Sequence, residues 1–238
     1  MVLILIPLKA LVNASCPSTT PSVSHAHGNR TQTQPLSLSA PELPRLLSHP
    51  LLTPTGHMQR LLNTYFDTPE LALQQRRMAV RERLAGDQWL LTVKTAGQSQ
   101  NGLSRRQEWE GPTTPGALQF DTLVDDAALA QDLMALRPTL RALFCTDFER
   151  QRWVIAHAGA HIEVALDQGR IHVPGTELSE PLLELELELL SGSEEALVAL
   201  ADALRHTPQG PVMLVPSDAS KAQRGMALWE RVQSTRDE

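Results

Sequence analysis

The segment that decides the fold is Leu182-Leu183-Glu184-Leu185-Glu186-Leu187-Glu188-Leu189-Leu190. Its strict alternation of leucine and glutamate has the two-residue period of a β-strand, so the three glutamates lie on one face and the leucines between them on the other. Successive glutamates are then about 7 Å apart along the strand. They repel one another unless water, cations or basic side chains lie opposite. Taken alone, the segment is compatible with a strand whose glutamates are in solvent.

The overall composition limits the protein to a few classes. A length of 238 residues with 42% hydrophobic residues suits one large globular domain or two small ones. The formal net charge of −6 argues against a general nucleic-acid-binding protein, which would need an excess of basic residues. The two cysteines, Cys16 and Cys145, are too few for a disulfide framework or a cysteine-rich metal site. A reducing, cytoplasmic setting is therefore expected, with no nucleic-acid partner.

Residues 1–30 differ from the remainder of the chain. They carry Ser, Thr, Pro and His without apolar periodicity, which predicts a disordered or non-native leader ahead of a domain at residues 31–235. The apolar run at residues 2–7 weakly resembles a signal peptide, but no basic residue precedes it and Lys9 follows it closely. No run in the sequence is long enough to span a bilayer, so no membrane association is expected.

The rest of the sequence predicts short strands separated by turns, with several helices among them. Strand-like patterns occur at residues 36–38, 61–66, 78–84, 88–94, 103–110, 146–156, 161–166, 171–173 and 182–190. Helical spacing with suitable first residues predicts helices at residues 39–47, 69–77, 115–143 with a break at Pro138, 196–205 and 220–232. The stretch Asp167-Gln168-Gly169-Arg170 is predicted as a turn. Short strands joined by such turns are typical of an antiparallel sheet.

Charged residues alternate on one face of strand after strand. The pattern includes Arg81 and Arg83, Thr92 and Lys94, Arg106 with Glu108 and Glu110, Arg150 and Arg152, and Glu163 and Asp167. An open sheet with one face in water would mix polar residues freely, whereas here arginine concentrates on some strands and glutamate on another. A closed antiparallel β-barrel of the α+β class, with a charged lumen and helices packed outside, explains this segregation and removes the sheet edges. Scattered ion pairs on an exposed sheet are the alternative.

A lumen of this kind has a definite chemistry. The planar, permanently charged guanidinium group of arginine suits the oxygen atoms of phosphate. Grouped carboxylates suit hard divalent cations such as Mg²⁺ or Mn²⁺. The expected partner is thus a small polyanion, such as tripolyphosphate or a nucleoside triphosphate, bound together with a divalent metal.

Eight segments resemble the CYTH superfamily, the triphosphate tunnel metalloenzymes, in sequence and in order. They are residues 62–69 (LNTYFDTP), 80–83 (VRER), 89–94 (WLLTVK), 106–110 (RQEWE), 148–150 (FER), 162–169 (IEVALDQG), 184–188 (ELELE) and 220–225 (SKAQRG). The family includes class IV adenylate cyclases, thiamine triphosphatases and bacterial inorganic triphosphatases, and the resemblance is closest to the last group. It extends over residues 36–232 and implies the tunnel-shaped barrel.

The resemblance also implies roles for individual residues. Triphosphate oxygens would be bound by Arg81, Arg83, Lys94, Arg106, Arg150, Lys221 and Arg224. The metal would be held by Glu186, Glu188 and Glu108, while Glu110, Glu163 and Asp167 would line or brace the lumen. The catalytic groups would be Lys94, Arg150 and Glu186. This implies that a metal-oriented water attacks the terminal phosphorus, assisted by charge neutralisation.

One motif of that family is missing. The family opens with a Glu-x-Glu-x-Lys strand that supplies metal ligands and a phosphate-binding lysine, whereas the corresponding stretch here is Thr31-Gln32-Thr33-Gln34-Pro35. Threonine and glutamine are weak ligands for Mg²⁺, and Pro35 cannot donate a strand hydrogen bond. Either the protein is a degenerate relative that lacks half of its metal site, or a displaced start has replaced the true first strand.

Several functions follow from these observations. The first is metal-dependent hydrolysis of inorganic triphosphate to diphosphate and phosphate, impaired here by the loss of the first acidic strand. The second is a non-catalytic polyphosphate- or nucleotide-binding module on the same barrel. The third is a class IV adenylate cyclase, although the sequence has no visible adenine pocket. A structural β-domain with surface charges is the fourth, and it requires Arg81, Arg83 and Lys94 to point outward.

Overall fold

The structure is a computed structural model that describes residues 26–33, 35–53, 56–100, 103–217 and 219–235. The signal-like run at residues 2–7, Cys16 and most of the expected leader lie outside these residues. The longer strands are β1 Ala26–Thr33, β3 His57–Asp67, β4 Ala79–Ala85, β5 Gln88–Lys94, β7 Leu103–Pro112, β8 Arg141–His157, β9 Ala160–His172 and β10 Ser179–Ser191. The short ones are β2 Leu36–Ser37, β6 Gln98–Gln100, β11 His206–Thr207, β12 Gly210–Pro211 and β13 Val215–Pro216.

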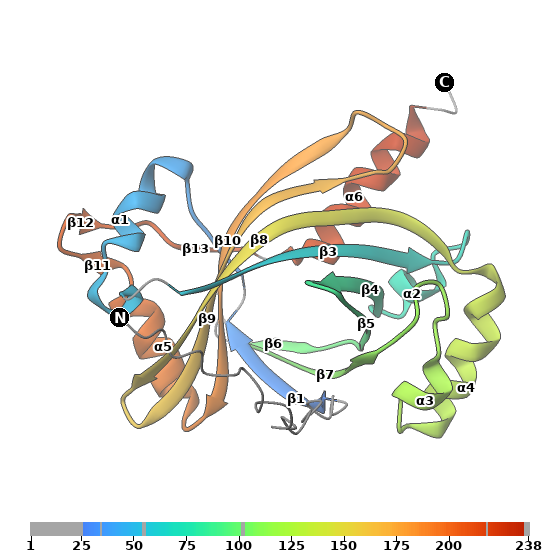
Figure 1. The fold of residues 1–238 in the computed structure, drawn as a ribbon, viewed down its shortest axis with the longest axis horizontal. Coiled ribbons are helices and arrows are strands. Elements are labelled where there is room, and N and C mark those ends of the chain that lie inside the picture. Colours follow the sequence, from blue (N-terminus) through green and yellow to red (C-terminus); the bar gives the residue numbers. More distant parts are fainter. Residues whose placement is uncertain (1–25, 34, 54–55, 101–102, 218, 236–238) are drawn as a thin grey trace, which may run out of the picture.

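The eight longer strands form a closed antiparallel barrel. They are hydrogen-bonded in the order β1-β7-β5-β4-β3-β8-β9-β10, and β10 pairs back with β1, where Gln32 lies opposite Glu188. Figure 1 shows the long strands β3, β8, β9 and β10 curving over the shorter strands β1, β4, β5 and β7. The closed α+β barrel expected from the sequence is confirmed, and the charged faces of its strands point inward.

Helices connect and cover the strands. They are α1 Leu43–Leu47, α2 Ala72–Gln75, α3 Phe120–Leu123, α4 Ala127–Leu136, α5 Glu194–Ala203 and α6 Lys221–Ser234, with 3₁₀ turns η1 Ala40–Glu42, η2 Pro50–Leu52 and η3 Arg137–Thr139. Ser39 and Ser220 each begin a helical segment with a capping box, and the Ser193 side chain accepts a hydrogen bond from the α5 backbone. The helix starts expected at Ser39 and Ser220 are therefore confirmed, and α5 begins two residues before the expected residue 196. No helix in the described ranges is long and apolar enough to cross a membrane.

Several elements differ from the predictions. The stretch 115–143 is helical only as far as η3, and β8 begins at Arg141. Strand β1 begins at Ala26, so it includes residues 26–30, which were predicted to belong to the leader. The helix expected at residues 69–77 is a single turn, α2, because Leu71 before it and Arg77 after it adopt left-handed backbone conformations with φ of 59° and 55°. The carboxylate of Asp67 accepts hydrogen bonds from the backbone N–H groups of Leu73 and Gln74, which stabilises this short helix.

The predicted turn at residues 167–170 is wrong. Strand β9 continues without a break through His172, and Gly169 pairs with Phe148 of β8. A Cβ atom on Gly169 would lie 2.2 Å from the carbonyl oxygen of Asp147. Glycine is therefore required here for the close approach of two strands rather than for a turn, and the continuous strand directs Asp167 into the lumen.

The outer faces of the strands carry the apolar core. Leu185 and Leu187 of β10 are fully buried and pack with Leu197 and Leu200 of α5. On the opposite side of the barrel, a second core joins the outer faces of β4, β5 and β7 to α3 and α4. Figure 1 shows α5 at one end of the barrel and α3 and α4 at the other. The alternation read from the sequence thus divides the apolar exterior from the charged interior.

Helix α6 has a different position, because it packs on the inward-facing side of the strands. Its buried residue Met226 joins a core with Phe144 of β8 and Ile171 of β9, and Figure 1 shows the helix lying against the long strands. A Cβ atom on Gly225 would lie 2.1 Å from the ring of Phe144, so the absence of a side chain allows this contact. The N-terminal end of α6 consequently delivers Lys221 to the lumen.

Candidate functional site

The lumen has one wall in which cations predominate, formed by β4, β5 and β7. We call its cationic residues the basic wall: Arg81 and Arg83 from β4, Lys94 from β5 and Arg106 from β7. Arg81 donates from Nε to Thr92 Oγ1 at 3.2 Å, and its Nη2 lies 3.4 Å from Glu110 Oε2. The inward direction of the basic wall rules out the surface-charged domain considered above.

Arg83 is positioned by a side chain that the sequence did not single out. Its Nε donates to Asn63 Oδ1 at 2.8 Å, and Asn63 Nδ2 donates to Thr146 Oγ1 at 3.0 Å. Asn63 is buried on β3, and its amide thereby fixes the orientation of the guanidinium group. Burial, followed by repulsion from Arg81, lowers the pKa of Arg83 to about 10, so it remains charged at neutral pH. Asn63 follows Leu61 and Leu62 and has the same parity as the buried residues Leu61 and Tyr65, which is the sequence signal that could have identified it.

Two carboxylates of β7 lie among these cations. Glu108 Oε2 accepts a hydrogen bond from Lys94 Nζ at 2.8 Å, and Glu108 is 3% exposed. Burial alone would raise the pKa of Glu108, but Lys94, Arg81 and Arg30 hold it well below its usual range. Burial lowers the pKa of Lys94 well below its usual value, and repulsion from Arg81 and Arg106 acts in the same direction while Glu108 opposes it. The ammonium group is therefore easier to deprotonate than an ordinary lysine.

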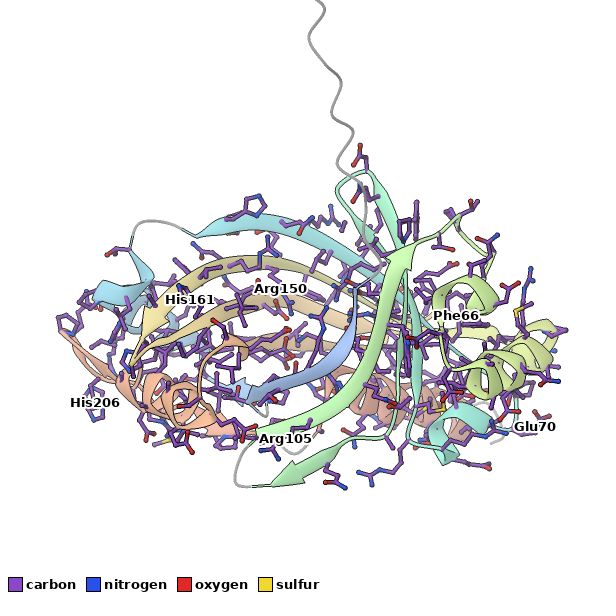
Figure 2. The ribbon with its side chains drawn as sticks, turned by 90° about the horizontal axis from the view of Figure 1, so that it is seen from below. Phe66, Glu70, Arg105, Arg150, His161 and His206 are labelled. Carbon is purple, nitrogen blue, oxygen red and sulfur yellow. The ribbon has the colours of Figure 1, made fainter. Side chains whose placement is uncertain are left out.

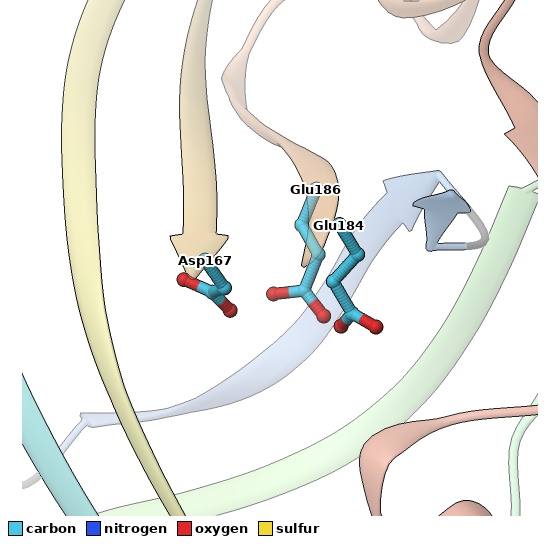
Figure 3. Close-up of side chains that lie close together, drawn as sticks. All are labelled: Asp167, Glu184 and Glu186. Atoms are coloured by element: carbon cyan, nitrogen blue, oxygen red, sulfur yellow. The ribbon is translucent and has the colours of Figure 1, made fainter. Parts of the chain in front are cut away.

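The facing wall is acidic. Asp167 of β9 and Glu184 and Glu186 of β10 place carboxylate oxygens within 4.8 Å of one another, and we call these three residues the acidic cluster. Figure 3 shows their carboxylates on neighbouring strands. Arg150 of β8 donates to both oxygens of Asp167, at 2.6 and 2.7 Å, and to Glu186 Oε2 at 2.8 Å. Figure 2 places Arg150 in the interior of the barrel, enclosed by the strands.

Lys221 lies within the acidic cluster. Its Nζ is 2.7 Å from Asp167 Oδ2 and 3.1 Å from Glu186 Oε1, and it also donates a hydrogen bond to Glu184. Burial lowers the pKa of Lys221, but the three carboxylates outweigh burial and raise it above its usual value. Lys221 is thus a fixed cation that neutralises part of the acidic cluster.

Strand β1 contributes one charged residue to the lumen. Its pairing with β7 and β10 places Gly28, Arg30 and Gln32 on the inward face. Arg30 Nη1 donates to both oxygens of Glu188, at 2.9 and 3.2 Å, and Arg30 Nε lies 3.9 Å from Glu108 Oε2. The first strand is therefore present in the barrel, but its inward face carries an arginine and no carboxylate. Arg30 was not among the predicted site residues, because residues 1–30 were predicted to form the leader.

Both groups of carboxylates already hold a cation. Lys221 occupies the space among the oxygens of the acidic cluster, and Arg30 contacts both Glu188 and Glu108. These oxygen donors are of the type that Mg²⁺ or Mn²⁺ prefers, but a metal at either position would have to displace an ammonium or guanidinium group. The residues present therefore do not fit a divalent cation in this arrangement.

The structure groups the expected site residues differently from the resemblance. Glu108 and Glu188 share Arg30, whereas Glu186 belongs to the acidic cluster. Arg224 does not face the basic wall, because it contacts Glu180 and Glu184. Of the remaining expected lining residues, Glu163 lies 3.5 Å from Arg152. The assignments of individual residues to metal, substrate and catalysis stay predictions.

Comparisons with known proteins agree with this fold. A model of the CYTH domain matches residues 38–225, a range that begins after β1. The inorganic triphosphatase of Haemophilus influenzae is 34% identical over 192 residues, which is 79% of this chain and 51% of that protein. The chain therefore spans about half the length of this curated relative.

Two solved structures illustrate the likeness of the barrels. One is an adenylyl cyclase candidate from Hippeastrum that shows a dominant triphosphatase activity, with a TM-score of 0.56 and 18% identity over 83% of this chain and 95% of that one. The other is an adenylate cyclase candidate from Bacillus halodurans, with a TM-score of 0.55 and 20% identity over 83% of this chain and 98% of that one. At these identities the likeness establishes the fold alone. The match of the CYTH domain model to residues 38–225, which is most of the sequence, shows that the chain belongs to the CYTH domain family.

Proposed function

We propose that the lumen binds inorganic tripolyphosphate and that the chain hydrolyses it to diphosphate and phosphate far more slowly than its active relatives. The observation that carries the proposal is the division of the lumen into a basic wall and an acidic wall. The basic wall offers three guanidinium groups and one ammonium group. These groups can donate hydrogen bonds to the several phosphate oxygens of a linear polyanion. The likeness to an inorganic triphosphatase supports tripolyphosphate as the first ligand to test.

The chemistry assigned to the chain's own residues is neutralisation of charge. Arg81, Arg83 and Lys94 project from adjacent strands, so they can contact successive phosphate groups and stabilise negative charge on a departing diphosphate. No nucleophilic side chain is required, because water is the attacking group. Burial lowers the pKa of Lys94, and its Nζ donates to Glu108 at 2.8 Å, so the ion pair with Glu108 keeps the ammonium group in place.

Slow turnover is expected because the carboxylates of the lumen are engaged by other residues. The family resemblance implies Mg²⁺ or Mn²⁺ as the cofactor, but Lys221 and Arg30 contact the acids that would bind it. The other proposed catalytic residues, Arg150 and Glu186, form a hydrogen bond with each other in the acidic wall. We therefore propose that hydrolysis remains slow even when either metal is supplied.

The test measures binding and turnover separately on the purified chain. Isothermal titration with tripolyphosphate is expected to give saturable binding, and a phosphate-release assay with Mg²⁺ or Mn²⁺ is expected to give little product. The variant Arg83→Gln should weaken binding, since it removes one guanidinium group from the basic wall. Arg60→Gln is the matched control, because Arg60 is exposed on β3 and pairs with Asp147 at 3.0 Å outside the lumen. Rapid metal-dependent phosphate release would contradict slow turnover, and a failure to bind would contradict the proposal as a whole.

A non-catalytic polyphosphate-binding module is the second proposal. The observation that favours it is the pairing of lumen carboxylates with Arg30 and Lys221, which leaves anion binding by the basic wall intact. This module would be stabilised thermally by tripolyphosphate and would release no phosphate on long incubation. Formation of cyclic AMP from ATP in the same samples would instead favour an adenylate cyclase.

A further inference from the structure

Two arginines lie directly opposite each other where β1 joins β7. The pairing of these strands places Arg30 against Arg106, and both residues belong to the inward-facing set of their strands. Like charges directly across a pair of strands destabilise a sheet. Arg106 Nε is moreover a buried donor without a hydrogen-bond partner among the described residues, which is costly unless something else accepts its hydrogen bond. This arrangement points to an anion between the two side chains.

The charges around this pair leave room for an anion. Five cationic side chains meet three carboxylates in this part of the lumen: Arg30, Arg81, Arg83, Lys94 and Arg106, against Glu108, Glu110 and Glu188. Arg30 satisfies Glu188 through Nη1, and Lys94 satisfies Glu108 through Nζ. Among these described residues each carboxylate is therefore paired, and the cations outnumber the carboxylates by two.

The inward side of β1 also has space next to Arg30. A Cβ atom on Gly28 would meet no atom of the described residues within 4 Å, although Gly28 lies opposite Glu108. The side chain of Arg30 is 31% exposed, in contrast to that of Arg81, which is 7% exposed. Arg30 is thus a lumen cation that a ligand can reach.

We propose that Arg30 and Arg106 clamp a phosphate group of metal-free tripolyphosphate, so that arginine supplies the neutralising charge a divalent cation would otherwise bring. This inference rests on the proposed function, which places tripolyphosphate in the lumen. It follows that the preferred ligand is the free polyanion. Mg²⁺ lowers the charge of the polyanion and occupies its oxygen atoms, so adding Mg²⁺ should weaken binding.

The first experiment needs no variant. Tripolyphosphate is titrated into the full chain by isothermal calorimetry, once in EDTA and once in excess Mg²⁺ at matched ionic strength. The expected result is tighter binding in EDTA than in Mg²⁺, and equal or tighter binding in Mg²⁺ would count against the clamp. A strict requirement for Mg²⁺ or Mn²⁺ would overturn the metal-free clamp and leave the proposed function standing. Absence of binding under both conditions would overturn the clamp and the proposed function together.

The second experiment assigns the effect to Arg30. Arg30→Gln is expected to weaken binding in EDTA at least about tenfold, which corresponds to about 1.4 kcal/mol. Mg²⁺ should then strengthen binding by this variant, because Glu108 and Glu188 lose their arginine and can accept a metal. Arg30→Lys, which retains the charge, should recover part of the affinity, and Arg60→Gln should bind as the unmodified chain does. Equal affinity of Arg30→Gln and the unmodified chain in EDTA would overturn the inference.

Discussion

Lys221 determines the electrostatic balance of the acidic wall. Its ammonium group contacts all three carboxylates of the acidic cluster, and it is 7% exposed. Removing one partner of a buried ion pair leaves uncompensated charge, which costs far more than the pair itself contributes. The same carboxylates are close enough together to act as ligands for one divalent cation. Lys221 therefore stabilises the barrel and at the same time prevents metal binding at this position.

We predict that Lys221→Met converts the acidic cluster into a metal site. The variant should lose about 3 to 5 kcal/mol of unfolding free energy in EDTA, because the buried carboxylates of Asp167 and Glu184 and the partly buried one of Glu186 then repel one another. Mn²⁺ should restore much of the loss, whereas it should leave the unmodified chain unchanged. Thermal unfolding with and without Mn²⁺ measures both effects. Arg224→Met is the control, since Arg224 contacts Glu184 from the same helix without lying inside the cluster. Equal responses of both variants to Mn²⁺ would contradict the prediction.

Glu110 gives the barrel a stability that depends on pH. Burial would raise its pKa, but Arg83, Arg81 and the Thr92 hydroxyl lower it from 4.5 to about 2, with Glu108 opposing them. A carboxyl group with a lowered pKa in the folded state stabilises that state above its unfolded pKa, and the stabilisation disappears as the pH falls through the folded value. The contribution is on the order of 3 kcal/mol.

We therefore compare the unfolding free energy of the unmodified chain with that of Glu110→Gln. The difference should be largest at neutral pH and should decrease between about pH 4.5 and 2. Urea denaturation at several pH values measures this difference. Glu149→Gln controls for the loss of a carboxylate, because Glu149 is exposed on β8. A difference that stays constant down to pH 2 would show that the interactions of Glu110 with Arg81 and Arg83 do not depend on its charge.

Many residues that face the lumen could be predicted from the sequence, but Arg30 and Asn63 were missed, and the partners of the others could not be predicted. The two-residue period of a strand fixes which side chains share a face, so Arg81, Arg83 and Glu186 were identified from alternation alone. Their contacts depend on which strands are neighbours and on register, which no local pattern specifies. Lys221 was expected to bind phosphate, yet it donates to carboxylates, because α6 packs on the inward side of the strands.

At the level of elements, Gly169 explains why one strand was divided in the prediction. Asp, Gln and Gly in succession are typical of a turn, and the sequence alone offers no reason to read them otherwise. The structure shows a continuous β9, in which Gly169 allows the backbone of β8 to approach. A glycine needed for close packing and a glycine needed for a turn look identical in sequence, so the distinction required the neighbouring strand.

Helix α6 provides a prediction at the same level. Replacing a glycine by alanine inside a helix normally stabilises it by about 0.5 to 1 kcal/mol. In Gly225→Ala the new Cβ would overlap the ring of Phe144, so we expect a net loss of about 1 to 3 kcal/mol of unfolding free energy. Helix α6 would have to move away from Phe144 and strand β8, which would also withdraw Lys221 from the acidic cluster. Urea denaturation measures the loss.

The double variant Gly225→Ala with Phe144→Leu tests the steric explanation. Leucine lacks the ring that the new Cβ would meet, so the double variant should be more stable than the sum of the two single changes predicts. Additive losses, or a Gly225→Ala variant as stable as the unmodified chain, would exclude the contact with Phe144 as the reason for glycine at this position.

For the whole molecule, closure of the barrel was predictable and its closing strand was not. Opposite charges on different strands indicated a shared interior, and the outer leucines indicated covering helices. Strand β1 was missed in part because residues 26–30 have no apolar alternation. Its place is fixed by backbone pairing with both β7 and β10. Backbone pairing does not depend on the type of side chain, so it is compatible with an arginine on the inward face.

The distribution of charge over the molecule gives the final prediction. The chain has a formal net charge of −6, although its lumen contains an excess of basic groups over carboxylates on the β4, β5 and β7 side. Arg81 and Lys94 are enclosed by strands, so only a slender anion can contact them, while a long or wide polyanion meets an outer surface of net negative charge. Duplex DNA is therefore expected not to displace tripolyphosphate from the chain, even at low ionic strength, where DNA binding is strongest. A competition titration with a fluorescently labelled duplex measures this directly, and pyrophosphate serves as the positive control for displacement from the lumen. Displacement by the duplex at equal phosphate concentration would mean that the basic groups are accessible from outside the barrel, which would contradict an enclosed site.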